Sequence, residues 1–368
     1  MLEYLKHNLK QKYSNWLYLQ AAKRGSKAFF QEFLSKELEK LTMEEKQIIE
    51  IHWGKIIPKT KLGFEAYRIY KTFYGFNVQF VPEAYFYPYI LRSLNPTQDY
   101  ISFSHKGLID IIFKDLSTPK TLLYKIGSQI LGNNYNGVSE TQILHIISNN
   151  TNGLILKPTK NTNSGQGIMF IEPATHTHKI YEVLNSFKGD WVLQEIVQQS
   201  SFTSQFNPTS LNTFRVITLY LNNVCSICCT ILKLGAKGKR VDNGVQGAQW
   251  IDIDKEGRLA PTGHTLDGSE WKAHNNIEFK NKIVPNIEKL RLFAIEAHKR
   301  LPGVGIVGWD IALDSSNEPV LIEGNLWWPS VSYPQLLSAK PFFGERTEEV
   351  INYVRSNPPS LLGLRVKI

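Results

Sequence analysis

The fold is most readily inferred from Gly308-Trp-Asp-Ile-Ala-Leu-Asp314, followed closely by Glu318-Pro-Val-Leu-Ile-Glu-Gly-Asn325. Its apolar runs predict two strands, over 305–313 and 319–322, that are joined by a short polar turn. Glu323 and Asn325 lie two residues apart, so their side chains leave the same face of the second strand. Asp310 lies on the first strand. The pattern therefore predicts carboxylate and amide oxygens on one hairpin.

These side chains suit a hard metal ion. Mg²⁺ takes a few carboxylate or amide oxygens and completes its shell with water and phosphate. We therefore predict that Asp310, Glu323 and Asn325 bind magnesium. A purely structural hairpin is the alternative, but an apolar strand that runs into Glu-Gly-Asn is an unusual end for one.

A second signal is Lys157, which ends an apolar stretch and precedes the polar loop 161–167. Lysine is a point charge with three donors. Ser164, Gly165 and Gly167 give the loop backbone N–H groups that can surround phosphate oxygens. The order differs from the Walker pattern, in which the lysine follows the glycines and a helix comes next. An ordinary glycine-rich hairpin is the alternative interpretation.

The rest of the chain predicts an α+β protein with largely antiparallel strands. Residues 1 to about 75 are expected to be helical, and Thr42 with Glu45 forms a capping-box signal for one of these helices. The apolar residues that recur at helical spacing are Phe29, Phe30, Phe33, Leu34, Leu38 and Leu41. Further helices are expected over 105–116, 139–148, 179–187 and 284–301. Strands are expected over 153–158, 167–171 and 191–197, and 212–221 and 224–234 should pair through a hairpin at Asn222-Asn223.

Composition limits the functional classes. The chain has 368 residues, a net charge of +9 and a pI near 9.2, with 42% hydrophobic and 20% charged residues. The basic residues are spread along the chain, whereas a nucleic-acid-binding protein usually concentrates them on one element. An anionic substrate fits this diffuse charge, and a solvated surface without a specific partner explains it equally well.

Compartment and metal signals are weak. No run of eighteen apolar residues predicts a spanning helix, and the N-terminus lacks the apolar core of a signal peptide. Cys225, Cys228 and Cys229 are clustered, which argues against a disulfide framework, and we expect a cytoplasmic protein without stable membrane insertion. Three cysteines on one strand cannot complete a tetrahedral zinc site without another ligand.

Together, these signals resemble the ATP-grasp superfamily. The resemblance implies an ATP-grasp fold, in which two α+β lobes clamp ATP, and it implies Mg²⁺ as a cofactor. The separation of Asp310 and Glu323 and the Glu-x-Asn ending are similar to those of the D-alanine–D-alanine ligase-like members. By the same resemblance, Lys106 is the first nucleotide lysine, and Lys157 reaches the phosphates.

The resemblance also assigns an adenine hinge and a catalytic arginine. The hinge is similar to Trp191-Val-Leu-Gln-Glu-Ile-Val197, in which the Gln194 and Glu195 backbone groups and Val197 would contact the base. Arg215 is always charged and forked, so it suits a phosphate or acyl-phosphate oxygen. From its sequence alone, it could equally be a surface arginine. Arg215 and Lys157 are the predicted catalytic residues.

A closer resemblance, over roughly residues 60–340, is to the ATP-grasp group associated with sugar transfer and polysaccharide gene clusters. The phrases 210–218 and 241–244 carry it, together with the strand pair that contains Asp310. Two positions depart from the pattern. The first lysine follows His105 instead of an acidic or amide residue, and Gly247 is followed by alanine where a second glycine is usual.

The resemblance implies an ATP-dependent carboxylate–amine ligase that acts through an acyl phosphate. Its expected partners are a small carboxylate and an amine, and a uronic acid of a cell-envelope glycan precursor is one candidate acid. Two alternatives stay open: a small-molecule kinase, and a non-catalytic nucleotide-binding module of a glycan-synthesis complex. The expected regions are a helical part (1–97), two ATP-grasp lobes (98–196 and 197–345) and a C-terminal tail (346–368).

Overall fold

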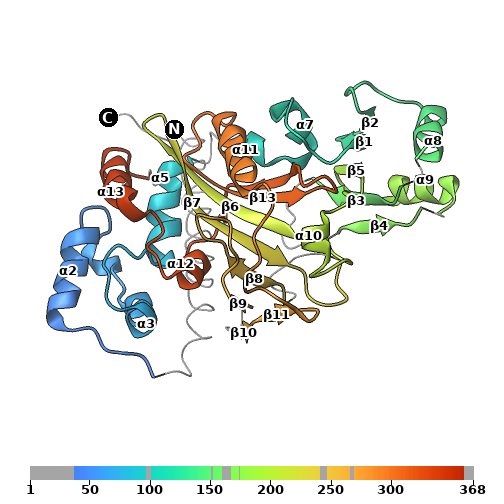
Figure 1. Ribbon diagram of the computed structural model, residues 1–368. Helices are drawn as coiled ribbons and strands as arrows, with labels where there is room; N and C mark the ends of the chain where they lie inside the picture. The colour runs from blue at the N-terminus through green and yellow to red at the C-terminus, as the bar shows by residue number, and fades with distance from the viewer. Residues whose placement is uncertain are drawn as a thin grey trace, which may run out of the picture.

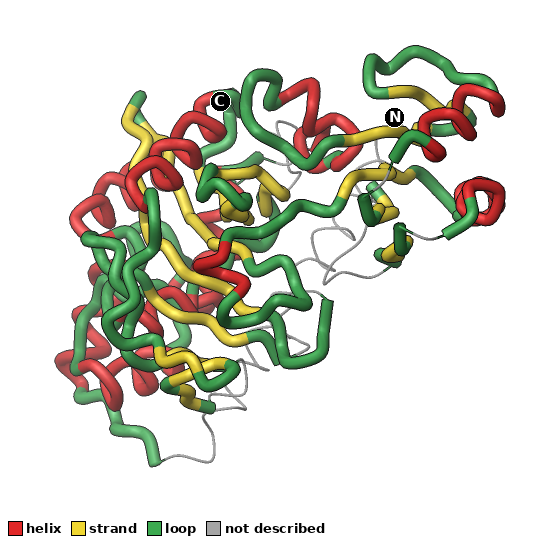
Figure 2. Tube along the Cα trace, turned by 45° about the vertical axis from the view of Figure 1, so that its right-hand side comes forward, coloured by secondary structure: helices red, strands yellow, loops and turns green. Residues whose placement is uncertain are grey.

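The computed structural model describes residues 37–96, 101–150, 152–159, 167–173, 175–240, 247–265 and 269–359. A larger and a smaller sheet are surrounded by helices (Figure 1), and Figure 2 shows the smaller sheet set apart from the larger one. This mixed architecture confirms the predicted α+β class. The apolar stripe predicted over 29–34, and most of the loop 161–167, lie outside the described residues.

The larger sheet has the strand order β10-β9-β8-β7-β6-β13-β14 within the described residues, and its neighbouring strands are antiparallel. The strands are β6 (Thr213–Leu221), β7 (Val224–Leu234), β8 (Gln249–Asp252), β9 (Gly263–His264), β10 (Glu270–Trp271), β13 (Ile306–Leu313) and β14 (Pro319–Asn325). The hairpin predicted at Asn222-Asn223 is confirmed. Both asparagines have positive φ, 49° and 63°, which a tight hairpin turn between twisted strands requires.

The smaller sheet has the order β2-β1-β5-β3-β4. Its strands are β1 (Thr121–Ile126), β2 (Gln129–Gly132), β3 (Leu154–Pro158), β4 (Met169–Ile171) and β5 (Trp191–Glu195). Helices α8 (Glu140–Ser148) and α9 (Thr177–Ser186) pack on it, and their apolar residues share one core with Leu156 and Leu193. A separate short ribbon pairs β11 (Ala273–His274) with β12 (Ile277–Glu278).

Helix α11 (Ile287–Lys299) covers one face of the larger sheet (Figure 1). Its stripe of Ile287, Leu290, Ala294 and Ala297 is buried in the same core as Trp309 of β13. The predicted helical periodicity over 284–301 is therefore confirmed, because the residues spaced three and four apart are the ones that pack on the sheet.

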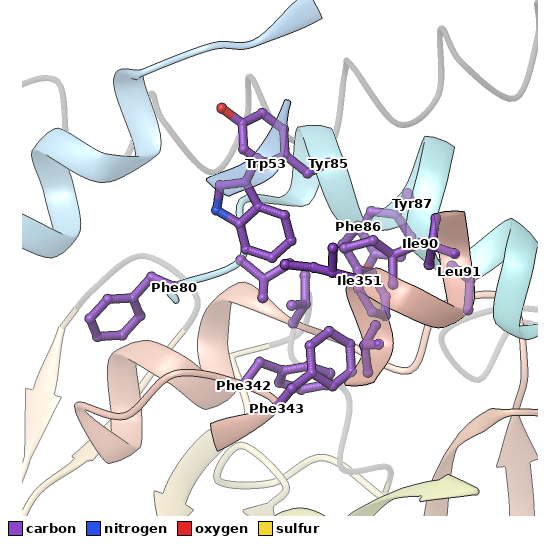
Figure 3. Packing of buried hydrophobic residues seen from close by; sticks show 14 of the residues in the cluster. Trp53, Phe80, Tyr85, Phe86, Tyr87, Ile90, Leu91, Phe342, Phe343 and Ile351 are labelled. Carbon is purple, nitrogen blue, oxygen red and sulfur yellow. The ribbon is translucent and has the colours of Figure 1, made fainter. Parts of the chain in front are cut away.

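The other face is covered by helices from both ends of the described chain. These are α2 (Met43–Trp53), η1 (Lys59–Lys61), α3 (Glu65–Tyr74), α4 (Glu83–Tyr85), η2 (Phe86–Leu91), α5 (Arg92–Leu94), α12 (Ser332–Ser338), η6 (Gly344–Arg346) and α13 (Thr347–Ser356). Trp53, Phe86, Phe342 and Ile351 lie in one aromatic-rich core (Figure 3). The α13 segment of the expected C-terminal tail is therefore part of this core.

Polar contacts cap one of these helices and anchor another. The predicted capping box of α2 is present, since the Glu45 N–H donates to Thr42 Oγ1 (3.1 Å) and the Thr42 N–H donates to Glu45 Oε2 (2.7 Å). Gln335 is fully buried, accepts from the Val81 N–H (2.8 Å) and donates to the Val81 carbonyl (2.9 Å). Helix α12 is therefore linked to the chain between α3 and α4 by hydrogen bonds as well as by apolar packing.

The helix predicted over 105–116 is wrong in length. The chain instead forms the 3-10 helices η3 (Ile101–Ser104) and η4 (Lys106–Leu108), then the short α7 (Ile109–Ile112). Asp115 has a φ of 72°, which an α-helix cannot accommodate. Asp110 also accepts a hydrogen bond from Thr118 Oγ1 (2.7 Å), which turns the chain back after one helical turn. A further short helix, α10 (Ser201–Ser204), follows β5.

Among the described residues, none of the helices combines the length and the apolar composition that a bilayer crossing requires.

Candidate active site

The register of the larger sheet places three predicted site residues in one row. Asp310 of β13 lies opposite Glu323 of β14 on one side and opposite Arg215 of β6 on the other. Directly opposed residues of antiparallel strands point to the same face. Asn325, two residues after Glu323, lies opposite Gly308 in the same strand pair. The sheet therefore presents Glu323, Asp310, Arg215 and Asn325 together on the face opposite α11.

Asp310 lies at the centre of a buried polar cluster. Arg215 holds it with two hydrogen bonds, Nε to Oδ1 (2.7 Å) and Nη2 to Oδ2 (3.0 Å). Lys233 Nζ lies 3.2 Å from Oδ2, and Asn325 Nδ2 lies 3.3 Å from it. Burial alone would raise the pKa of Asp310, but Arg215 and Lys233 together hold that pKa well below its usual range. The carboxylate is therefore ionised at every physiological pH.

Lys233 belongs to this buried cluster, and the sequence reasoning missed it. It lies on β7 between apolar neighbours, in Ile231-Leu-Lys-Leu234, and its side chain is only 7% exposed. A lysine inside an apolar strand is a recognisable signal, because lysine is rarely buried unless it is paired. The sequence does not reveal the partner, since Asp310 is distant along the chain.

The two predicted phosphate lysines lie on the side of the smaller sheet and reach towards Glu323. Lys106 Nζ lies 2.9 Å from Glu323 Oε2. The Lys106 backbone N–H donates to the carbonyl of Thr159 (3.3 Å), the residue that follows β3. His105 Nδ1 accepts from the Gly107 N–H (3.1 Å), which fixes the start of η4. Lys106 is therefore anchored beside the strand that carries Lys157.

The pKa of Lys157 shows that it lies close to Lys106 and Glu323. Burial and the nearby positive charge of Lys106 together lower the pKa of Lys157 to about 8, although Glu323 partly offsets them. Two lysines close enough to repel each other form a ready site for an anion. The structure thus brings together Lys106, Lys157 and Glu323, which lie far apart in the sequence.

The predicted hinge lies at the end of β5. Gln194 donates from Nε2 to Thr121 Oγ1 (2.9 Å), and the Glu195 backbone N–H donates to the Lys120 carbonyl (2.9 Å). The Glu195 carboxylate is paired with Lys120 Nζ (2.6 Å). Within the part of the chain that the structure describes, the Val197 N–H donates to no protein group. Among the three predicted hinge residues, Val197 is therefore the one whose N–H can donate to a ligand.

The phosphate loop is described only at its end. Ser164 and Gly165 lie outside the described residues, as do Asp242 and Asn243 of the 241–244 phrase. Gly167 has a φ of 74°, and an added Cβ would lie 3.1 Å from Cγ of Pro158. Only glycine adopts this conformation without strain. The chain therefore turns sharply where the loop re-enters β4.

A protein-family model matches the part of the sequence that forms this candidate site. The model of the sugar-transfer associated ATP-grasp family matches residues 88–350, which is most of the chain and includes the residues above. The chain belongs to this family. The expectation drawn from the sequence motifs is thereby confirmed at the level of the family.

Three solved structures are similar to this chain at low sequence identity. VanG D-Ala:D-Ser ligase from Enterococcus faecalis is 14% identical, with a TM-score of 0.41 over 72% of this chain and 61% of that one. L-amino acid ligase from Bacillus licheniformis is 13% identical, with a TM-score of 0.38 over 69% and 48%.

N5-carboxyaminoimidazole ribonucleotide synthetase from Thermotoga maritima is 13% identical, with a TM-score of 0.37 over 63% of this chain and 44% of that one. The chain thus spans less than two thirds of the length of each of these three proteins. A comparison with curated proteins gave no match.

The side chains of this candidate site fit magnesium. Two carboxylates and an amide are the donor types that Mg²⁺ prefers. Within the described residues, Asp310 Oδ1 accepts a single hydrogen bond, from Arg215, so it keeps a lone pair for a metal ion. The group contains two acidic residues, and the third oxygen donor would be the amide of Asn325. Its Nδ2 donates to the Gly308 carbonyl (3.1 Å), which leaves Oδ1 for a metal.

Proposed function

We propose that the protein is an ATP-dependent carboxylate–amine ligase that acts through an acyl phosphate. The observation that carries this proposal is the convergence of Lys106 and Lys157 from one side with Glu323, Asp310 and Arg215 from the other. Cations that face paired carboxylates suit a nucleotide whose phosphates are shared with a metal ion.

The proposed reaction has two balanced steps. An oxygen of the substrate carboxylate attacks the γ-phosphorus of ATP in line, and the bond to the ADP oxygen breaks, which gives an acyl phosphate and ADP. The amine nitrogen then attacks the acyl carbon, the carbon–oxygen bond to phosphate breaks, and the nitrogen loses a proton. The products are an amide, ADP and phosphate.

The residues of the chain supply position and charge in these steps. Val197 would orient the adenine through its N–H, and Lys106 and Lys157 would hold the phosphate oxygens. Arg215 and Lys233 would balance the negative charge on the transferred phosphoryl group and the acid. Magnesium held by Asp310, Glu323 and Asn325 would neutralise phosphate charge. No nucleophilic side chain is needed, because the substrate carboxylate is itself the nucleophile.

The substrates are expected to be a small carboxylate and an amine. The description of the family associates it with sugar transfer, which supports a carboxylate of a glycan precursor as the acid. The assay is ADP release with an acid panel, in the presence and absence of amines. A ligase needs both substrates and yields an amide. ADP release that needs the acid but never an amine identifies a kinase, and nucleotide binding without turnover identifies a binding module.

Glu323→Gln tests the metal assignment. The variant keeps the shape of the side chain and loses one ligand charge, so ADP formation should fall at least about 100-fold. Circular dichroism and gel filtration should remain unchanged. Glu318→Gln is the matched control, because Glu318 lies just before the same strand but pairs with Lys289 at the surface. Near wild-type turnover of Glu323→Gln would refute the assignment.

A further inference from the structure

His105, the residue before Lys106, uses both nitrogens of its imidazole. Nδ1 accepts from the Gly107 N–H (3.1 Å), so this nitrogen carries no proton, and the neutral imidazole has its proton on Nε2. Nε2 lies 3.6 Å from Oδ2 of Asp190, which is too long for a direct hydrogen bond but close enough for electrostatic attraction. The imidazole therefore connects η4 with Asp190.

Asp190 directly precedes β5 and is anchored to two neighbouring segments of the smaller sheet. Its Oδ1 accepts from the Gly127 N–H (2.8 Å), in the turn between β1 and β2. Its backbone carbonyl accepts from the N–H of Thr159 (3.0 Å), the residue that follows β3. The carboxylate that faces His105 is thus fixed by contacts at the ends of several strands.

These contacts close a ring that includes the first predicted phosphate lysine. Thr159, which donates to Asp190, accepts at its own carbonyl from the Lys106 N–H (3.3 Å). Lys106 follows His105 in the chain, and His105 faces Asp190. Lys157 lies two residues before Thr159, on β3. The backbone of Lys106 is therefore held from two directions against the strand that carries Lys157.

Gly107, on the other side of Lys106, is held equally closely. A Cβ added to Gly107 would lie 2.9 Å from Cε1 and 3.1 Å from Nδ1 of His105, so the imidazole packs directly on this glycine. The Gly107 carbonyl accepts from the hydroxyl of Tyr135 (3.0 Å). Both backbone polar groups of Gly107 are therefore bonded, which limits the movement of η4 and of Lys106 with it.

We propose that His105 is a positioning residue for the nucleotide phosphates, and that it holds Lys106 in place beside Lys157 through Asp190. The proposal rests on the proposed ATP-dependent function and adds a residue to its site. An asparagine side chain ends where an imidazole has Nδ1 and Cδ2, so asparagine can cap η4 but falls short of Asp190. Histidine makes both contacts at once.

The test compares the binding of Mg-ADP and of adenosine to the full-length protein. His105→Ala removes the cap and the contact with Asp190, so Mg-ADP binding, measured by isothermal titration calorimetry, should weaken about five- to tenfold. Adenosine lacks phosphates, so its binding, measured by saturation-transfer NMR titration, should stay unchanged. His105→Asn should recover part of the Mg-ADP affinity, because its amide oxygen can cap η4.

A double-mutant cycle separates the positioning of Lys106 from a general structural effect. In a Lys106→Met background, His105→Ala should cost little further Mg-ADP affinity, because His105 acts through that lysine.

His52→Ala is the matched control. His52 and His105 are similarly exposed (12% and 13%), and each lies near a carboxylate. His52 lies 3.4 Å from Glu348 but belongs to α2, in the helices that cover the larger sheet. Its replacement should leave Mg-ADP affinity unchanged.

The outcomes distinguish this positioning role from the proposed function. Unchanged Mg-ADP affinity in His105→Ala would overturn the positioning role, as would additive losses in the cycle or an equal loss of adenosine binding. In each of these cases the wild-type protein binds Mg-ADP, so the proposed function stands. If the wild-type protein itself fails to bind Mg-ADP, the ATP-dependent function and the positioning role are both wrong.

Discussion

Gly308 has little room for a side chain beside the proposed reaction centre. An added Cβ would lie 2.9 Å from Pro329 and 3.3 Å from Cδ of Arg215. Gly308→Ala should therefore displace the arginine that holds Asp310 and the segment at Pro329, whose carbonyl accepts a hydrogen bond from Arg215 Nη1 (3.3 Å). We expect ADP formation to fall about 10- to 100-fold, since small misplacements have effects of this size. The free energy of unfolding should fall by about 1–3 kcal/mol.

Steady-state kinetics and urea unfolding of the same preparation check this prediction. Gly137→Ala is the control, because an added Cβ there meets no atom within 4 Å. An unchanged turnover in Gly308→Ala would mean that Arg215 and Pro329 can move apart without consequence, contrary to the proposed placement.

At the level of single residues, the placement of the candidate side chains was predictable where they lie close together in the sequence. Glu323 and Asn325 are two residues apart on one strand, and the structure places them on the face that also carries Asp310. Lys233 was missed because its partner depends on the order of the strands. The two-way ion pairing of Asp310 could not be predicted for the same reason, since Arg215 and Lys233 come from two other strands.

Secondary structure elements were predictable where a side-chain pattern alone determines the conformation. The hairpin at Asn222-Asn223, the capping box of α2 and the stripe of α11 are of this kind. The helix over 105–116 was not, because Asp110 uses its carboxylate to bind Thr118 and Tyr124 rather than to support a longer helix. The length of this helix depends on contacts between elements, and these cannot be read from a single sequence.

Helix α11 is attached to the larger sheet through a buried histidine. His298 Nε2 donates to the Val304 carbonyl (3.1 Å), so Nδ1 accepts from Thr218 Oγ1 (2.7 Å). That hydroxyl in turn accepts from Trp309 Nε1 (2.8 Å). Every group in this chain is satisfied when the imidazole is neutral. Burial lowers the pKa of His298 to about 4, although the bond to Val304 partly opposes the shift.

This arrangement predicts a loss of stability in mild acid. The folded pKa lies below the unfolded value of about 6.5, so the unfolded state binds the extra proton. The contribution is complete above about pH 6.5 and is lost as the pH falls towards 4, by about 3 kcal/mol in total. Urea unfolding at pH 7.5, 6 and 5 measures it. His298→Gln should flatten the profile, whereas the exposed His145→Gln should not. Equal slopes in the two variants would contradict the assignment.

For the whole molecule, the decisive feature is how the smaller sheet is held against the larger one. Lys106 and Glu323 form one bridge between the two sides of the site. A second bridge lies nearer the surface, where Arg240, just beyond β7, reaches β4. Its guanidinium lies 4.0 Å from the centroid of the Phe170 ring, and its Nη1 lies 2.6 Å from Glu172 Oε1. The predicted phosphate loop leads into β4, so this bridge fixes the strand at the end of the loop.

Arg240→Ala should loosen the smaller sheet without unfolding the protein. Exposed ion pairs and cation–π contacts contribute about 1 kcal/mol or less, so the melting temperature should hardly change. A loss of about 1 kcal/mol in holding β4 would weaken Mg-ADP binding about fivefold and speed amide exchange over 167–173.

Glu172→Gln in the Arg240→Ala background should add little, because the two changes remove the same contact. Arg258→Ala is the matched control, since Arg258 is exposed and pairs with the nearby Asp254 and Glu256. Unaltered exchange over 167–173 together with wild-type Mg-ADP affinity would show that Arg240 does not hold β4 in place.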